Sequence, residues 1–322
     1  MGWIALNLDL KLLLTTHFPN LEVTQELATP AAALLTRCSD WRLATRVVTY
    51  RSVEWAIDSF APSKSPGVDS IFPALLQKRR KAVIPYLVRI FRACLSTSYV
   101  PTIWRQVKVV FIPKPGRTYY SGPSENRPIS LTSFLLKTME RLVDRCLREE
   151  ALALVPLHPN QHAYHAGKSE ETARNQLIVR VEKALDQQET ALGVFLDIEE
   201  SFNNTCYDTM CDALVRHGSD YTIVRWIRVI LEGRVAVETL NVLSMRLAIS
   251  MGYPHGGVLS LLQCCLVVDN LLARLSGNGY LFMDTQVTCL LAVGKSQKHS
   301  IKTHSVGSSN RRYMVQRGRT IG

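Results

Sequence analysis

The sequence predicts an α+β fold, because helical and strand patterns are mixed along it without the regular strand–helix–strand repeat of a parallel sheet. Apolar residues recur every three or four positions at 49–60 and 71–96, which is typical of helices that pack one face on a core. β-Branched residues alternate at 107–113, and two alternating segments lie within 235–250, which predicts a strand and a hairpin. We therefore expect helices and sheets in the same chain.

The composition is that of a folded protein with a polyanionic partner. The chain has 322 residues, of which 47% are hydrophobic, so it can bury a sizeable core. Its formal net charge is +11. Nucleic acid is the first partner to consider, because Lys and Arg that neutralise phosphates supply most non-specific affinity for it. A basic protein that binds nothing in particular is the alternative.

The first half of the chain is predicted to be mainly helical. Residues 1–44 show an amphipathic helical pattern and then a link that contains Pro and Ala, so they form a connecting segment. Thr49 is placed to cap the next helix, and Pro85 is expected to start a helix or kink the one at 71–96. Lys114 to Asn126 is rich in turn residues and predicts a loop. The remaining expected elements are a helix over 130–147, a loop or short strand over 157–164 and a helix over 170–187.

The second half is predicted to alternate short helices and strands. Helices are expected at 207–217 and 221–231, and the segment 256–272 reads as a loop followed by a helix. A last hairpin is expected at 280–293. Residues 294–322 hold seven Lys or Arg and no acid, with many Ser, Thr and Gly, which predicts a basic, disordered tail.

The sequence favours an intracellular location, in the nucleus or the cytoplasm, and no membrane partner. No signal-peptide pattern begins the chain, and the apolar run at 257–268 is too short to span a bilayer. The eight cysteines lack the spacing of a zinc site, so we expect reduced thiols.

The most informative segment is 194–202. An apolar run ends on Asp197, and Phe202 follows five positions later. This pattern suits a strand that carries a carboxylate to its end before the chain turns into a helix. A carboxylate in that place can bind Mg²⁺, which prefers hard oxygen ligands. An aspartate that merely caps the next helix is the alternative.

Four further motifs surround this segment in a fixed order. They are Lys64–Asp69 (KSPGVD), Val109–Gly116 (VVFIPKPG), Arg127–Ser133 (RPISLTS) and Gly252–Ser260 (GYPHGGVLS). Each motif alone is weak. Together with the Asp197 segment, their order and spacing resemble the reverse transcriptases of non-LTR retrotransposons, most closely the jockey-like group, over residues 45–295.

The resemblance implies an RNA-directed DNA polymerase with a right-hand palm and fingers, built on an antiparallel palm sheet with packed helices. It implies fingers with part of the palm over 45–190 and the palm over 191–293, with no thumb in the chain. It also implies Mg²⁺ as the metal, with Mn²⁺ as a substitute. The implied partners are an RNA template, a DNA primer and deoxynucleoside triphosphates.

The resemblance assigns roles to five positions. Asp197 is the first metal-binding carboxylate, and the carbonyl of Ile198 is a backbone ligand. Lys114 and Arg127 grip the triphosphate, unless they are solvated loop charges. Phe202 is a steric gate whose ring rejects the 2′-hydroxyl of a ribonucleotide, and an ordinary core aromatic is the alternative.

The nucleotide-binding motif departs from the family pattern. His255 stands where the family has Gln between Pro and Gly, and Leu261 stands where Pro is usual. His255 and Gly256 would line the nucleotide, with the glycine allowing close backbone approach. A histidine can still donate one hydrogen bond, but its shape and charge differ from those of glutamine. Asn203 also replaces an Asp that the family has after the gate residue.

The second catalytic carboxylate depends on how the last motif is aligned. The family has Tyr-Ala-Asp-Asp in a hairpin there. One alignment without a gap places Gln286 and Val287 at the two aspartates, and neither can be an anionic ligand. The other takes Phe282 to Thr285 as the motif, which keeps Asp284 as the second metal carboxylate. In this second alignment, a turn residue without a catalytic role is the alternative for Asp284.

Three hypotheses for the function follow. The first is a reverse transcriptase domain of a transposable element with impaired or absent nucleotidyl transfer. The second is a catalytically dead relative that binds nucleic acid through its basic surface. The third is a relic that folds poorly.

Overall fold

The computed structural model describes residues 16, 18, 22–23, 39–114, 122, 125–165, 167–188, 190–197, 203–240, 243–274, 280–283 and 286–293. Of residues 22–23, 190–197, 238–240, 243–245, 280–283 and 286–293 it describes the backbone alone. Most of the connecting segment 1–44 and the whole tail 294–322 lie outside the described residues, and so do the predictions for them.

The chain divides into two compact units. The first comprises residues 1–156 and 200–266, and the second comprises 157–199 and 267–322. The last boundary falls inside helix α11 (Leu259–Arg274). The predicted boundaries at 44, 190 and 293 between connecting segment, fingers, palm and tail remain predictions.

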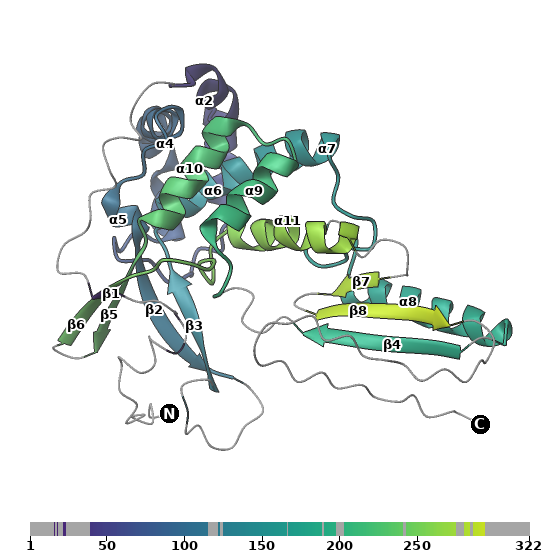
Figure 1. The fold of residues 1–322 in the computed structure, drawn as a ribbon. Coiled ribbons are helices and arrows are strands. Elements are labelled where there is room, and N and C mark those ends of the chain that lie inside the picture. Colours follow the sequence, from purple (N-terminus) through teal and green to yellow (C-terminus); the bar gives the residue numbers. More distant parts are fainter. Residues whose placement is uncertain are drawn as a thin grey trace. The chain divides into compact units, whose positions relative to one another are not determined.

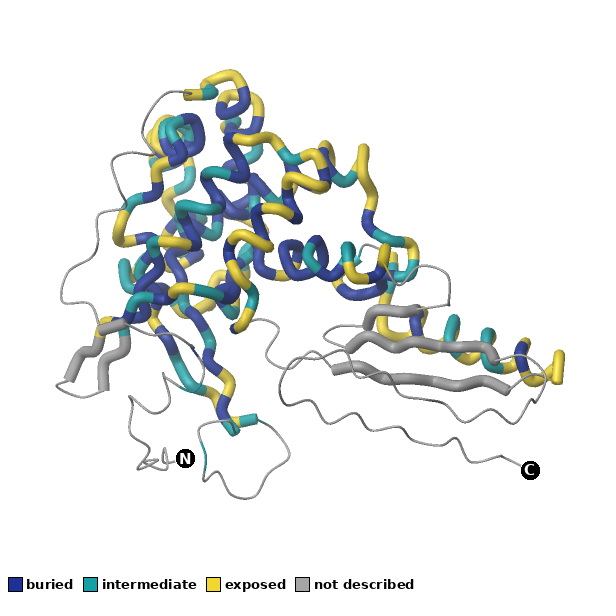
Figure 2. Tube along the Cα trace, viewed as in Figure 1, coloured by how far each residue is buried: buried dark blue, intermediate teal, exposed yellow. Residues whose placement is uncertain are grey.

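The first unit is built around packed helices (Figure 1). Helix α3 packs on α4 and α6, and α10 packs on α9 and α4. Figure 2 shows that buried residues concentrate on the faces where these helices meet, and Phe91, Leu214 and Trp226 have no exposed surface. The helices are α2 (Trp41–Val47), α3 (Tyr50–Asp58), α4 (Pro73–Ser96), α5 (Thr102–Arg105), α6 (Phe134–Cys146), α7 (Leu152–Leu154), α9 (Tyr207–Arg216) and α10 (Tyr221–Glu232), with a π-helical turn at Leu147–Ala151.

Local sequence explains where several of these helices begin. Thr49 caps α3 as predicted, because its Oγ1 accepts from Ser52 N at 3.1 Å while Ser52 Oγ accepts from Thr49 N at 2.9 Å. Pro85 lies inside α4, so 71–96 contains one long helix rather than two. The sequence does not predict α2, because its seven residues are fewer than the window over which a helical period can be recognised.

The first unit also contains a five-stranded sheet of order β1-β6-β5-β2-β3. All pairs are antiparallel except β2 with β5, which are parallel. One face carries a cluster of buried side chains, and the opposite face carries exposed residues such as Lys108, Arg127 and Arg246. The strands are β1 (Glu22–Val23), β2 (Gln106–Pro113), β3 (Asn126–Leu131), β5 (Val235–Leu240) and β6 (Leu243–Ala248).

Strand β3 corrects the sequence-based prediction. A loop through Asn126 and a helix from Ser130 were expected, but residues 126–131 pair with β2 and α6 begins only at Phe134. Ser133 sets that start, because its Oγ accepts from Leu135 N at 3.1 Å. Pro128, which cannot donate to a ladder, is tolerated because β3 is an edge strand. Cross-strand pairing has therefore overridden the local helical spacing.

The second unit contains α8 (Glu170–Asp186) and a three-stranded antiparallel sheet of order β4-β8-β7. The strands are β4 (Thr190–Asp197), β7 (Tyr280–Met283) and β8 (Gln286–Val293). Helix α8 packs on β4 and β7. The expectation that the strand ending at Asp197 pairs with the hairpin of 280–293 in one antiparallel sheet is confirmed.

The α+β class, with an antiparallel sheet and packed helices, is confirmed. Among the described helices, none combines the length and apolar character needed to cross a bilayer. None of the six cysteines whose side chains the structure describes forms a disulfide.

Candidate active site

The segment 254–258, which precedes α11, forms a tight turn that is fixed to its neighbours. Gly257 N and Ser260 Oγ both donate to Pro254 O, at 2.9 and 2.8 Å. Ser130 N donates to His255 O at 2.7 Å, which ties the turn to β3. Gly256 has a φ of +109°, and a Cβ there would lie 3.0 Å from Ser130 O. The turn therefore requires glycine at position 256.

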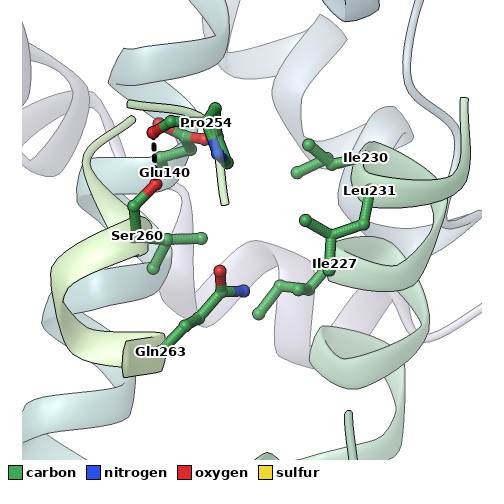
Figure 3. A pocket seen from close by; sticks show the side chains of 8 residues that line it. Glu140, Ile227, Ile230, Leu231, Pro254, Ser260 and Gln263 are labelled. Atoms are coloured by element: carbon green, nitrogen blue, oxygen red, sulfur yellow. Dashed lines mark hydrogen bonds between the residues drawn. The ribbon is translucent and has the colours of Figure 1, made fainter. Parts of the chain in front are cut away.

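A buried carboxylate holds the end of this turn. Glu140 in α6 is only 2% exposed, and its Oε2 accepts from Val258 N at 2.9 Å, so it caps the first turn of α11. Figure 3 shows Glu140 beside Pro254 and Ser260, in a small cavity that Ile227 and Gln263 also line. Burial raises the pKa of Glu140 to about 7, although the Val258 N–H and the charges of Lys137 and Arg234 act against it.

A buried arginine fixes the backbone that leads into the turn. Arg234 is 3% exposed and donates from Nη2 to Tyr207 Oη at 2.9 Å, to Met251 O at 3.2 Å and to Gly252 O. Tyr207 Oη in turn donates to Ile249 O at 2.8 Å. The segment 249–258 is thus held by one buried cation at its start and one buried carboxyl group at its end.

Sequence reasoning did not single out Glu140 or Arg234. A signal for Glu140 was present, because it lies one position after Met139 and four after Leu136 on the apolar stripe of α6. A charged residue on such a stripe is buried and needs a partner. For Arg234, which directly precedes a strand, we find no comparable signal.

Two of the three positions that depart from the family motifs in the first unit, His255 and Asn203, are in contact. His255 Nε2 lies 2.8 Å from Asn203 Oδ1, and Asn203 is 8% exposed. With the amide in this orientation, Nε2 carries the proton and donates it to Oδ1. The imidazole is therefore held by Asn203.

The side chains of Lys114 and Arg127 project from the same face of the β2–β3 hairpin. Ile112 pairs with Arg127, and Lys114 N donates to Glu125 O at 2.8 Å two positions further along the hairpin. Because side chains alternate along a strand, Lys114 and Arg127 share the face opposite the buried cluster. Arg127 is exposed and Lys114 is half-buried.

Asp197 is the last residue of β4, and its Cα pairs with that of Gln286. Gln286 also pairs with Met283, and Val287 pairs with Phe282. Both therefore lie in the β7–β8 ladder, and the link between the two strands consists of Asp284 and Thr285.

Three predicted site residues, Ile198, Phe202 and Asp284, lie outside the described residues, as does the side chain of Asp197. Asp197 belongs to the second unit, whereas Lys114, Arg127, His255 and Gly256 belong to the first. Within the part of the chain whose side chains are described, no group of three or more His, Cys, Asp or Glu is placed to hold a metal ion.

Comparison with known proteins assigns the family. The model of the reverse transcriptase (RNA-dependent DNA polymerase) family matches residues 112–306, which is more than half of the chain. Structurally, the telomerase of Candida tropicalis in complex with a fragment of telomeric RNA is similar at a TM-score of 0.47 and 11% identity, over 60% of this chain and 37% of that one.

Similar curated proteins come from mobile elements. A probable RNA-directed DNA polymerase from transposon BS of Drosophila melanogaster is 28% identical over 67% of this chain and 24% of its own length. The Pol polyprotein of the type-1 retrotransposable element R2 of Popillia japonica is 28% identical over 71% of this chain and 31% of its own length. This chain thus spans about a quarter of the length of such relatives. The chain belongs to the reverse transcriptase (RNA-dependent DNA polymerase) family, in the branch of the non-LTR retrotransposons that its motifs indicate.

Proposed function

We propose that the chain is an RNA-directed DNA polymerase domain that keeps the framework of its nucleotide site but catalyses only weakly. The observation that carries the proposal is the β4-β8-β7 ladder. It pairs Asp197 with Gln286, two residues after Asp284. Neighbouring strands are where a two-metal polymerase needs its carboxylates. The substrates are deoxynucleoside triphosphates, with an RNA template and a DNA primer, inside the cell.

The proposed metal ligands are Asp197, Asp284 and the carbonyl of Ile198. This donor set fits Mg²⁺, and Mn²⁺ as its substitute, because all three supply hard oxygen atoms. When bound, the metal would lower the barrier by stabilising charge on the attacking and leaving oxygens. Thr285 stands where the family has a second adjacent aspartate, so the chain offers one anionic ligand fewer.

The proposed nucleotide contacts are Lys114, Arg127, Phe202, His255 and Gly256. Lys114 and Arg127 lie on one face of the β2–β3 hairpin, which suits two cations that bind one triphosphate. Gly256 lets backbone approach the nucleotide, and Phe202 would exclude the ribose 2′-hydroxyl. In this proposal His255 weakens nucleotide binding, because its Nε2 already donates to Asn203 Oδ1.

Primer extension tests this function. The full chain, with an RNA template, a DNA primer and Mn²⁺, should add a few nucleotides slowly, and Asp197→Ala should add none. A circular-dichroism melt of both proteins controls for folding. Robust, processive synthesis would contradict the weak-catalysis part of the proposal. Equal residual synthesis by the parent and Asp197→Ala would contradict the assigned metal site.

Nucleic-acid binding without catalysis is the second candidate, and the net charge of +11 favours it. It predicts salt-sensitive gel shifts with RNA and no extension in either metal. A protein that neither binds RNA nor melts cooperatively would support the relic hypothesis instead.

A further inference from the structure

Helix α4 of the first unit has an unusual charge distribution. Its 24 residues contain six Lys or Arg and no Asp or Glu. Two of these cations serve the fold itself, because Arg80 pairs with Asp58 at 2.8 Å and Arg92 Nε donates to Val48 O at 2.9 Å. The other four, Lys78, Arg79, Lys81 and Arg89, are exposed.

One exposed face of α4 combines cations with an aromatic ring. It consists of Leu75, Lys78, Arg79, Tyr86, Arg89 and Ile90, and we call it the α4 face. At 3.6 residues per turn these positions fall within about 120° of the helix circumference. Tyr86 is 67% exposed, while the opposite side of the helix buries Ile84, Leu87 and Phe91. Among the described residues, none of the three cations of the α4 face forms a salt bridge or a side-chain hydrogen bond.

We propose that the α4 face binds single-stranded RNA, as a surface separate from the nucleotide site. Figure 1 shows α4 at the end of the first unit opposite to the tips of β2 and β3, where Lys114 and Arg127 lie. The choice of RNA over single-stranded DNA rests on the proposed function, and the surface itself rests on the charges and exposure of α4.

Charge complementarity selects a polyanion, and Tyr86 selects unpaired bases. Lys78 and Arg79 precede Tyr86 by about two turns and lie about 16 Å from Arg89 along the axis, at 1.5 Å per residue. That spacing lets the phosphates of an RNA strand contact cations on both sides of the Tyr86 ring. An exposed tyrosine between cations can stack on an unpaired base, which a duplex does not offer. An anionic membrane is the competing partner, but Leu75 and Ile90 stand at opposite ends of the face rather than as a continuous apolar strip.

The test measures the affinity of the full chain for a fluorescent, unstructured RNA of about 20 nucleotides at several salt concentrations. One variant combines Lys78→Gln, Arg79→Gln and Arg89→Gln. The matched control combines Arg46→Gln, Arg148→Gln and Arg174→Gln, which removes the same charge from arginines that already have acidic partners. The first variant should bind about ten-fold more weakly than the control, and its salt slope should fall by about two, at about 0.7 per phosphate contact.

Substitutions of Tyr86 test base stacking separately from charge, because they leave the charge of the α4 face unchanged. Tyr86→Leu should weaken RNA binding about five-fold without changing the salt slope, whereas Tyr86→Phe should bind like the parent. For blunt duplex DNA both substitutions should be neutral. Equal RNA binding by the two triple variants would overturn the proposal. So would a first triple variant that loses binding to phosphatidylserine vesicles but keeps its affinity for RNA, since the face would then bind a membrane.

Primer extension on the same proteins separates this proposal from the proposed function. If the parent makes no DNA but the α4 variant loses RNA affinity, the result contradicts the proposed polymerase function and supports RNA binding by the α4 face. If the parent makes DNA and the α4 variant binds RNA like the control, the result contradicts RNA binding by the α4 face and supports the polymerase function.

Discussion

His255 Nε2 lies 2.8 Å from Asn203 Oδ1, so two substitutions that are far apart in the sequence meet in the structure. Both stand where the family motifs have another residue, Gln for His255 and Asp for Asn203. These two departures from the family motifs therefore change a single contact. The role of His255 therefore depends on Asn203, since with the amide in this orientation Nε2 carries the proton.

This contact predicts energetic coupling between the two residues. Asn203→Ala and His255→Ala should each lower the free energy of unfolding, and the double variant should lose about 1 kcal/mol less than the sum of the two. Urea unfolding of the four proteins measures the cycle. Asn203→Ala combined with Ser260→Ala is the control, because the structure shows no hydrogen bond between them, and its effects should add. Additive effects for Asn203 and His255 would show that their contact contributes nothing.

The buried Glu140 predicts a dependence of stability on pH. Its folded-state pKa is about 7, against an ordinary value of 4.5. Between these values the folded state binds more protons than the unfolded state, so protonation of Glu140 favours folding. Its stabilising contribution is therefore complete below about pH 4.5 and is lost as pH rises through about 7, which amounts to about 3 kcal/mol.

Glu140→Gln isolates this effect, because the amide oxygen can still accept from Val258 N. Urea unfolding of both proteins from pH 5 to pH 8 should show the variant gaining stability relative to the parent as pH rises. A difference between the two proteins that stays constant over this range would mean that Glu140 does not titrate there.

The turn at 254–258 predicts a specific cost for a side chain at Gly256. Gly256→Ala should destabilise the protein by about 2 kcal/mol, because φ is +109° and the new Cβ would press on Ser130 O at 3.0 Å. Gly218→Ala is the matched control, since Gly218 also has a positive φ of +71° but open space around it. It should cost about 1 kcal/mol. Thermal melts compare the two variants. Equal shifts in melting temperature would mean that the close approach to Ser130 O adds no cost at Gly256.

How much of this structure follows from sequence depends on whether the signal is local. The helix at 50–58, capped by Thr49, and the hairpin of 280–293 are local patterns, and both were predicted. The pairing of β4 with β8 was predicted only through the family resemblance. The parallel pairing of β2 with β5 joins segments more than 100 residues apart, and no local pattern encodes it.

The site shows the same division. Asp197 could be proposed from the sequence because a carboxylate at the end of an apolar run is visible there, and its role stays a prediction. Arg234 and Glu140 were missed because their importance comes from contacts with Tyr207, Gly252 and Val258, which only the folded chain brings together. Buried charges of this kind are recognised from their partners rather than from their neighbours in sequence.

In the proposed site, Asp284 and Thr285 stand where the family carries its two adjacent catalytic aspartates. The most direct test is the rate of primer extension by Thr285→Asp on an RNA template in Mg²⁺, with the double variant Gln286→Asp/Val287→Asp as the matched control. Restoring the missing anionic ligand next to Asp284 should raise the rate at least about ten-fold over the parent, whereas the control should not exceed it. An increase in the control and none in Thr285→Asp would contradict the claim, and would place the catalytic pair at 286 and 287.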